Sequence, residues 1–177
     1  MTYIEGTPSE AWIEENRPDN GIYKVYWTKD GGATLNPDDG VGLRYEWEYK
    51  DGKYVDGESR GWYISGQLKQ IRPWKNGVRD GLRTTWYDNG QKKTQGTFKN
   101  DKLEGKWTKW YKNGRQKKSE KTYKDGNKEG LYTNWYKNGN KRMEGYYKGG
   151  IEIGEWTYWD KDGKKAVVGY YKDEKEE

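Results

Sequence analysis

The sequence contains no cysteine and no histidine among its 177 residues. The absence of cysteine excludes disulfides and thiolate chemistry, although it does not identify the compartment. The absence of histidine removes both the commonest general base and the commonest metal ligand. We therefore predict a protein that is not an enzyme, with no catalytic residue, no cofactor and no metal site.

Adjacent carboxylates at Glu14-Glu15 and Asp38-Asp39 are the remaining candidates for acid–base chemistry. Adjacent residues of a strand point to opposite faces, and in loops such pairs are usually solvated, so neither pair is expected to catalyse. Oxygen ligation of Ca²⁺ by Asp30, Asp38 and Asp39 is disfavoured, because the spacing of an EF-hand loop is missing.

Long hydrophobic runs are missing as well. Only 30% of the residues are hydrophobic, and no run approaches the ~20 residues that a membrane helix needs. The first residues, MTYIEGTPSE, show neither the basic region nor the apolar region of a signal peptide. The sequence therefore predicts a soluble, cytoplasmic protein.

Low hydrophobicity combined with 36% charged residues is typical of disordered chains. The chain nevertheless holds 17 Tyr and 11 Trp beside a single Phe, and disordered chains are poor in aromatic residues. Tyr and Trp bury large areas while their polar tips stay in water. This composition favours a thin folded structure with an aromatic core.

Charge is distributed unevenly along the chain. Residues 1–60 carry 7 Lys and Arg against 13 Asp and Glu, whereas residues 61–177 carry 27 against 16. The first third is therefore acidic and the remainder is basic.

A phrase of 24 or 25 residues recurs along the basic part of the chain. Each copy begins at a glycine, and a tryptophan stands five residues later, followed by a tyrosine. The starting glycines are Gly57, Gly81, Gly105, Gly130 and Gly154, and the tryptophans are Trp62, Trp86, Trp110, Trp135 and Trp159. Asp160 departs from the pattern because it occupies the tyrosine position, and a looser copy begins near Gly21. Such periodicity indicates a repeat protein.

Each repeat reads as two strands. The dipeptides Asn89-Gly90, Asn113-Gly114 and Asn138-Gly139 predict tight hairpins in which both turn residues take positive φ. The other turn, as at Lys124-Asp125-Gly126, also contains glycine and is expected to be longer. We predict an all-β fold over residues 21–177: an elongated, twisted single antiparallel sheet of sequential β-hairpins, with about six units and twelve strands.

Strand alternation predicts aromatic residues on both faces of this sheet. Trp107, Lys109 and Tyr111 share one face, and Thr108 and Trp110 point to the other. Glycines of the return strands either are covered by a neighbouring ring or form bulges, at Gly96, Gly145 and Gly169.

Two segments do not follow the phrase. Residues 1–20 predict a short N-terminal cap, either a helical turn that follows Thr7 or an edge strand. About residues 32–42 an insertion carries Pro37, Asp38 and Asp39 among three glycines, which predicts a surface loop. This is a candidate specificity loop, although an acidic loop without a role is favoured because long surface loops cost little.

Cationic pairs recur one repeat apart on the strand after the Asn-Gly turn. They are expected to align as a basic stripe, and together with the five repeat tryptophans they form the candidate binding surface. The pairs are Lys92 and Lys93, Lys117 and Lys118, Lys141 and Arg142, and Lys164 and Lys165. The stripe suits an anionic partner, whereas the alternative that we favour is that lysine keeps a long sheet soluble and blocks edge pairing.

The repeat unit GKWTKWYKNGRQKKSEKTYKDGNKE, residues 105–129, resembles the MORN-variant repeat of bacterial proteins labelled YwqK-family antitoxins. The resemblance is close over residues 57–177 and loose over residues 21–56. It implies an elongated sheet of hairpins and, from the antitoxin label, the binding of a partner protein. Related repeats are linked to membrane lipids and to scaffolding. The departures are Asp160, Lys121 in a glycine position and the insertion near Pro37, and the motif contains no catalytic residue to carry over.

We therefore expect a non-enzymatic interaction scaffold that neutralises or anchors a partner protein. The alternatives are binding to an anionic lipid or other polyanion through the lysines, and glycan binding on exposed aromatic rings. Nucleic acid is not an expected partner. The charged tail after the last strand should discourage edge pairing, which predicts a monomer, with edge-to-edge dimerisation as the alternative.

Overall fold

A computed structural model describes residues 20–171 of the chain. These residues contain twelve strands of six to nine residues, three strands of two residues and one short 3-10 helix. The prediction of an all-β fold built from sequential antiparallel hairpins is confirmed. The predicted N-terminal cap, apart from Asn20, and the charged tail lie outside the described residues.

The chain divides into two compact units, the first formed by residues 1–79 and 88–90 and the second by residues 80–87 and 91–177. The strands of the first unit are β1 (Gly21–Trp27), β2 (Ala33–Thr34), β3 (Gly42–Lys50), β4 (Lys53–Tyr54), β5 (Gly57–Trp62), β6 (Leu68–Lys75) and β7 (Val78–Arg79). The strands of the second unit are β8 (Gly81–Trp86), β9 (Lys92–Lys99), β10 (Lys102–Trp110), β11 (Lys117–Lys124), β12 (Asn127–Trp135), β13 (Lys141–Lys148), β14 (Ile151–Trp159) and β15 (Lys165–Tyr171).

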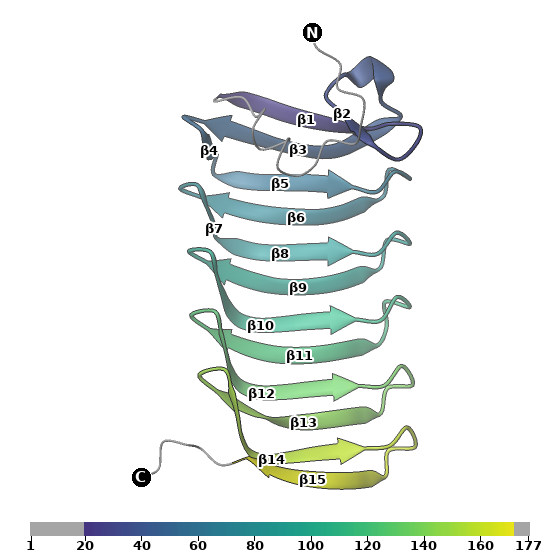
Figure 1. The fold of residues 1–177 in the computed structure, drawn as a ribbon, viewed down its shortest axis with the longest axis vertical. Helices are drawn as coiled ribbons and strands as arrows, with labels where there is room; N and C mark the ends of the chain where they lie inside the picture. The colour runs from purple at the N-terminus through teal and green to yellow at the C-terminus, as the bar shows by residue number, and fades with distance from the viewer. Residues whose placement is uncertain (1–19, 172–177) are drawn as a thin grey trace. The chain divides into compact units, whose positions relative to one another are not determined.

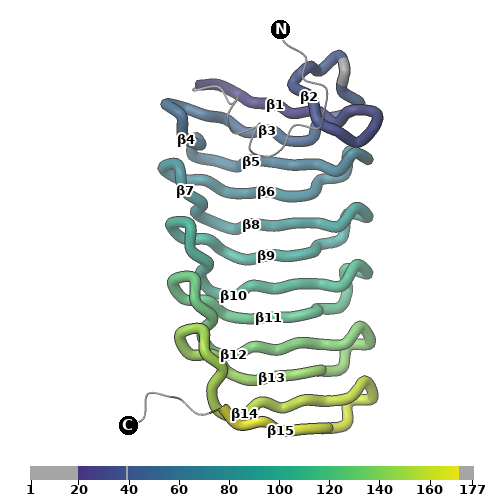
Figure 2. The backbone as a smooth tube through the Cα atoms, in the orientation of Figure 1, coloured from purple at the N-terminus to yellow at the C-terminus, as the bar shows by residue number. Residues whose placement is uncertain are grey.

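Within the second unit every strand pairs antiparallel with the strand that follows it, from β8 to β15 (Figure 1). Within the first unit the order is β2-β1-β3-β5-β6, with β4 paired to β3 and β7 paired to β6. In the second unit, the two kinds of turn lie at opposite ends of the strands (Figure 2).

The lengths of the two kinds of turn are the reverse of those predicted: the Asn-Gly turns are the longer ones, and the other turns have two residues. Two-residue turns include those at Asp51-Gly52, Asn76-Gly77 and Asp125-Gly126, where both residues have φ between 51° and 87°. Strand pairs such as Lys124 with Asn127 enclose them directly. These values belong to type I′ turns, which match the twist of the flanking strands.

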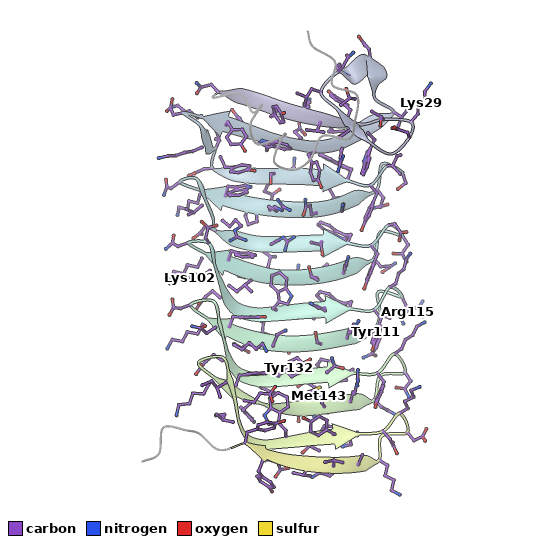
Figure 3. All side chains as sticks on the ribbon, viewed as in Figure 1. Lys29, Lys102, Tyr111, Arg115, Tyr132 and Met143 are labelled. Carbon is purple, nitrogen blue, oxygen red and sulfur yellow. The ribbon has the colours of Figure 1, made fainter. Side chains whose placement is uncertain are left out.

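The Asn-Gly turns are longer than predicted. At the third of them, only Gly139 takes a positive φ, of 99°, and the Tyr136 N–H donates to the carbonyl of Asn140 across three intervening residues. In the repeat that spans 25 residues, the Tyr111 N–H donates to Gln116 instead. Arg115 is therefore the additional residue of that repeat, and Figure 3 shows it at this turn, beside Tyr111.

The starting glycines recur because their backbone needs a left-handed conformation. All six have positive φ, from 63° at Gly154 to 141° at Gly57. At Gly105 the pairing of β10 with β9 shifts between Glu104 and Trp107, which identifies a β-bulge. Glycine adopts this conformation without the steric cost of a Cβ atom.

Carboxylates cap the type I′ turns from the preceding repeat. In the first unit Asp56 accepts the N–H of Asn76 at 2.6 Å. In the second unit Glu129 accepts the N–H of Gly149 at 2.8 Å. Asp80 and Glu104 make the equivalent bonds to Asn100 and Asp125. The residue before a starting glycine therefore links one hairpin to the next.

The core of the second unit lies on the face that carries Phe98, Trp107, Tyr132, Tyr147 and Trp156, here named the core face. Trp156 is fully buried, and its ring centroid lies 5.2 Å from that of Tyr147. Aromatic pairs at such distances contribute beyond the area they bury. The core therefore consists of aromatic rings on one side of a sheet rather than of aliphatic side chains between layers.

Two of the three return-strand glycines are covered by rings. A Cβ atom on Gly96 would lie 2.2 Å from the Trp107 ring, and one on Gly145 would lie 2.2 Å from the Trp156 ring. A Cβ atom on Gly169 would approach only Tyr171, at 3.8 Å. The covering ring comes from the following strand, and within the described residues no strand follows β15.

The insertion of the first unit is not entirely a surface loop. Its residues Ala33 and Thr34 form β2, which pairs with Trp27 and Tyr26 of β1, and Ala33 is buried. Residues Pro37–Asp39 form a 3-10 turn in which the Asn36 side chain accepts the N–H of Asp38. The glycines of this segment led to the prediction of an open loop, but a Cβ on Gly40 would lie only 2.6 Å from Tyr26.

Candidate interaction surface

The repeat tryptophans of the second unit form a ladder with lysines of the paired strands. Trp110 is opposite Lys117, and the other pairs are Trp86 with Lys92, Trp135 with Lys141, and Trp159 with Lys165. Opposite residues share a face, so Trp and Lys alternate from β8 to β15. This face is here named the ladder face, and it lies opposite the core face because Trp110 follows Lys109 and Thr108 follows Trp107 along β10.

Three of the ladder lysines also contact the tryptophan of the next repeat. The ammonium of Lys117 lies 5.9 Å from the centroid of Trp135. The equivalent distances are 6.0 Å from Lys92 to Trp110 and 5.7 Å from Lys141 to Trp159. Such cation–π contacts are worth about 0.5–1 kcal/mol at exposed sites. The tryptophans are half-buried and the lysines are exposed.

The second cation of each pair lies on the other face. The register shifts between Lys109 and Trp110, so that Lys118 is the additional residue of a β-bulge in β11. Its ammonium lies 5.7 Å from the ring of Tyr111. Lys93 over Tyr87 and Arg142 over Tyr136 repeat the arrangement at 5.6 Å and 5.8 Å. Adjacent residues of a strand point to opposite faces, so the two cations of a pair do not form the single basic stripe that was expected.

The predicted pair at Lys164 and Lys165 is out of register with the others by one residue. Lys165 is the ladder lysine, because it pairs with Trp159. Lys164 is the turn residue whose carbonyl accepts the N–H of Asp160, as Gln116 does for Tyr111. Ala166 therefore occupies the place of the second cation. The last repeat thus lacks both the tyrosine ring, replaced by Asp160, and the cation that lies over it.

The repeat tyrosines are structural. The hydroxyl of Tyr111 donates to the carbonyl of Trp135 at 2.8 Å. Tyr87 and Tyr136 donate to the carbonyls of Trp110 and Trp159 at 2.8 Å and 3.0 Å. In the first unit the indole N–H of Trp27 makes the equivalent bond to Trp62 at 3.2 Å. Each Trp-Tyr pair therefore holds the next hairpin through the Tyr and presents the Trp on the ladder face.

Carboxylates balance part of the charge on the ladder face. Glu120 lies 2.6 Å from the Lys117 ammonium and 3.2 Å from that of Lys106. Glu144 lies 2.7 Å from Lys141 and accepts the buried hydroxyl of Thr133 at 2.9 Å. Burial opposes ionisation of Glu120, but the hydrogen bonds from Lys117 and Lys106 outweigh it and lower the pKa of this carboxyl. Sequence reasoning missed these partners because the glutamates stand outside the phrase.

Apolar side chains stand beside the same ladder. Leu82 and Leu131 lie four residues before Trp86 and Trp135, so alternation places them on the ladder face, and they are 53% and 42% exposed. Tyr146, which pairs with Leu131, is 53% exposed. The ladder face therefore combines half-buried rings, exposed apolar groups and paired charges.

Among the predicted tryptophans, Trp62 differs from the rest because it belongs to the first unit. It pairs with Leu68, so its neighbour on the ladder face is apolar rather than cationic. It is half-buried like the others, and its carbonyl accepts the indole N–H of Trp27.

The candidate specificity loop at Pro37–Asp39 stands apart from the ladder. Pro37 and Asp38 are exposed. The nearby Asp30 accepts hydrogen bonds from the Thr28 hydroxyl and the Gly32 N–H, and these bonds lower the pKa of its carboxyl. Among residues 20–171, no three His, Cys, Asp or Glu side chains come together in a way that could hold a metal ion.

A hollow in the first unit is too small to hold a typical organic ligand. It measures about 60 Å³ and is lined in part by Trp47, Tyr54, Ser59 and Trp74. Ligand pockets usually measure about 300–1,000 Å³. In the part of the chain that the structure describes, no helix is long and apolar enough to cross a membrane.

Four segments of the chain match the family model described as the MORN repeat variant: residues 55–76, 79–100, 128–148 and 152–173. The MORN repeat variant is not a family of enzymes. No curated protein matches the chain. Each matched segment contains a starting glycine, the strand that carries it and the return strand described above, except that β12 and β14 begin one residue before the third and fourth segments. The chain is therefore a repeat protein, and four of its segments are similar to the MORN repeat variant.

Proposed function

We propose that the chain is a non-enzymatic interaction scaffold and that the ladder face binds a partner protein. The observation that carries this proposal is the alternation of Trp and Lys from β8 to β15, repeated at the spacing of the hairpins. Tryptophan and tyrosine are among the residues that dominate the binding energy of protein interfaces, whereas lysine suits their polar rim. The scaffold supplies these groups on a rigid sheet, so little freedom is lost on binding.

A protein suits this face better than a polyanion because the charge there is partly compensated. Lys117 and Lys141 already pair with Glu120 and Glu144. An anionic surface would have to displace or tolerate these carboxylates, whereas a protein can meet both signs with its own rim residues. Exposed Leu131 and Tyr146 supply apolar area at the same face.

Neutralisation or anchoring of that partner in the cytoplasm is the finer part of the proposal. It rests on the resemblance of the repeats to those of antitoxin-like proteins. Covering an active surface of the partner with a long sheet face would block it without any chemistry, which agrees with the family of the matched repeats.

The test is affinity capture from the native cell with the wild-type chain and two variants. Trp110→Ala combined with Trp135→Ala removes two rings of the ladder, and Lys99→Ala combined with Lys124→Ala is the control at exposed strand ends on the other side of the hairpins. One stoichiometric protein should be captured by the wild type and the control and lost by the ladder variant. Equal capture by all three, with folding verified by circular dichroism, would contradict the proposal.

The neutralisation part needs a second experiment. The captured protein is expressed alone and together with the chain, and growth of the host is followed. We expect the chain to relieve growth inhibition and the ladder variant to fail. If the captured protein does not inhibit growth, the chain anchors its partner rather than neutralising it.

Peripheral binding to anionic lipid is the alternative function, favoured by the excess of 27 basic over 16 acidic residues in residues 61–177. It predicts sedimentation with phosphatidylserine vesicles at low salt and release at high salt. Glycan binding on the tryptophans is disfavoured because the rings are half-buried between lysine stems.

A further inference from the structure

Four lysines gather on the core face of the second unit, opposite the ladder. Lys109 of β10 is paired with Thr94 on one side and Ser119 on the other. Lys93 precedes Thr94 and Lys118 precedes Ser119, each in its bulge, and Lys121 lies two residues beyond Ser119 on the same face. The four residues, here named the lysine cluster, occupy three neighbouring strands, which span roughly 10 Å at ~4.8 Å per strand.

The lysine cluster exists because two positions depart from the repeat. In other repeats the place of Lys109 is taken by Thr85, Asn134 or Tyr158, four residues after the starting glycine. The place of Lys121 is taken by glycine at Gly96, Gly145 and Gly169. Without these two lysines, the bulge cations would stand singly, one in each repeat.

The charges of the cluster are not compensated. Ion pairs serve several lysines of the ladder face, such as Lys117 and Lys141. In residues 20–171 no carboxylate forms an ion pair with any of the four cluster lysines. Partial removal from water, followed by repulsion from Lys121, Lys118 and Lys93, lowers the pKa of Lys109. The four ammonium groups of the cluster therefore repel one another, and a bound anion would reduce this repulsion.

Aromatic rings hold the cluster lysines in place. The ammonium groups of Lys93 and Lys118 lie over Tyr87 and Tyr111, whose hydroxyls are bonded to backbone carbonyls of the next repeat. Lys121 lies 5.6 Å from the centroid of Tyr132 and 6.0 Å from that of Tyr123. Because the rings are fixed, the ammonium groups are partly ordered before any ligand arrives, which lowers the cost of binding.

We propose that the lysine cluster binds an acidic protein segment, in which several Asp or Glu carboxylates lie close together. This inference rests on the proposed function, since the segment would belong to the partner protein, but it assigns that segment to the face opposite the ladder. Four ammonium point charges without a guanidinium suit carboxylates in several orientations, whereas a phosphate site more often uses the bidentate fork of arginine. A footprint of three strands suits a short segment better than the broad surface of a bilayer.

The direct test uses a fluorescein-labelled peptide of eight alternating Asp and Glu residues, followed by anisotropy in 50 mM salt. The cluster variant is Lys109→Gln with Lys121→Gln, and the matched control is Lys92→Gln with Lys141→Gln, which removes the same charge from the ladder face. We expect the cluster variant to bind about thirtyfold more weakly, since two lost charge contacts of about 1 kcal/mol each in water total about 2 kcal/mol, and the control to stay within about twofold. Equal weakening in both variants, or no binding to the wild type, would overturn the inference.

Two further measurements test whether the lysine cluster binds a different ligand. Cluster-dependent sedimentation with phosphatidylserine vesicles but no peptide binding would assign the cluster to a membrane and overturn the acidic segment. Self-association that light scattering detects in the wild type and not in the cluster variant would assign it to the acidic first third of a second copy, and would also contradict the inference. If the captured partner is lost by the Trp110→Ala and Trp135→Ala variant but kept by the cluster variant, the proposed function stands and this inference alone fails.

Discussion

The two units form the same kind of hairpin but differ in the side chains that the hairpins carry. In the second unit lysine faces tryptophan along the ladder, as Lys117 faces Trp110. In the first unit leucine takes that position: Leu68 faces Trp62 and Leu43 faces Tyr26. The ring position is therefore part of the scaffold, and the position opposite is free to vary with the surface that is needed.

The core faces differ in a similar way. In the first unit Trp74 stacks on Tyr54 with centroids 3.5 Å apart, and its indole N–H donates to Ser59 at 2.9 Å. In the second unit Trp156 is fully buried over Gly145. Trp74 is therefore held by stacking and a polar contact, whereas Trp156 is held by burial. In the described part of the first unit, Lys69 lies over Tyr63 as a bulge cation does, but Gly61 occupies the place of Lys109, so the lysine cluster is incomplete there.

The largest difference between the units should appear on truncation of their core rings. Trp156→Ala should lower the free energy of unfolding by about 4 kcal/mol, because a fully buried ring is lost and leaves a cavity. Trp74→Ala should cost about 2 kcal/mol, since this ring is only half-buried. Urea unfolding followed by far-UV circular dichroism measures both. Equal losses would show that burial does not distinguish the two cores.

A methyl group on the covered glycines tests what the units share. Gly145→Ala should destabilise the protein by about 1–3 kcal/mol, because the new Cβ would lie 2.2 Å from the Trp156 ring. Gly61→Ala in the first unit should cost a similar amount, since its Cβ would lie 2.7 Å from the Tyr45 ring. Lys121→Ala is the matched control, because this position of the next repeat already holds a side chain. A control as costly as Gly145→Ala in urea unfolding would argue against the role of ring coverage.

The repeat motif predicts the strands but not the face of the sheet on which each side chain lies. The spacing of Gly and Trp predicts twelve strands in sequential order, and the structure contains them. Alternation alone separates Lys117 from Lys118, because adjacent residues of a strand point to opposite faces, and the expectation of a single stripe overlooks this. The position of the bulge, which leaves Lys118 unpaired beside Ser119, cannot be read from the spacing of the repeat.

Turn chemistry shows the same limit of sequence reasoning. Asn138-Gly139 has the dipeptide preferred for a two-residue turn, yet the hydrogen bond from Tyr136 to Asn140 closes a longer loop. Asn100-Asp101 contains no glycine and nevertheless forms a turn with both residues at positive φ, of 47° and 65°. The pairing of the strands on both sides determines the length and conformation of these turns. The dipeptides are compatible with that conformation but do not determine it. The capping carboxylates could have been found, since an acidic residue precedes Gly57, Gly81, Gly105 and Gly130.

These caps should make a smaller contribution that is alike in both units. Glu129→Ala removes the acceptor of the Gly149 N–H, and Asp56→Ala removes that of the Asn76 N–H. Each should cost about 1 kcal/mol, which is the typical net value of such a bond at an exposed site. Urea unfolding measures the loss, and amide exchange of Gly149 or Asn76 should accelerate in the matching variant alone. Unchanged exchange at these amides would show that the caps do not hold the turns.

The smallest effect is a pH dependence that only the second unit should show. Because burial and three neighbouring lysines lower the pKa of Lys109 in the folded state, the folded protein binds this proton more weakly than the unfolded chain does. The resulting penalty is fully present below the folded pKa and disappears as the pH rises through it towards the ordinary value of about 10.4. Stability should therefore increase slightly over that window, and Lys109→Gln should remove the part of the increase due to Lys109, whereas Lys121, whose pKa is also lowered by burial, keeps its own part.

The pKa itself distinguishes repulsion from burial. An NMR titration of the Lys109 side chain should give a higher pKa in Lys121→Gln than in the wild type, because one repelling charge has gone. Lys124→Gln removes an exposed charge at the end of the same strand, which does not contribute to the shift, and should leave the pKa of Lys109 in place. If neither variant moves it, burial alone lowers the pKa and the four lysines do not act as one charged group. The difference between the units would then be confined to the ladder face, because the core face of the second unit would hold no collective anion site.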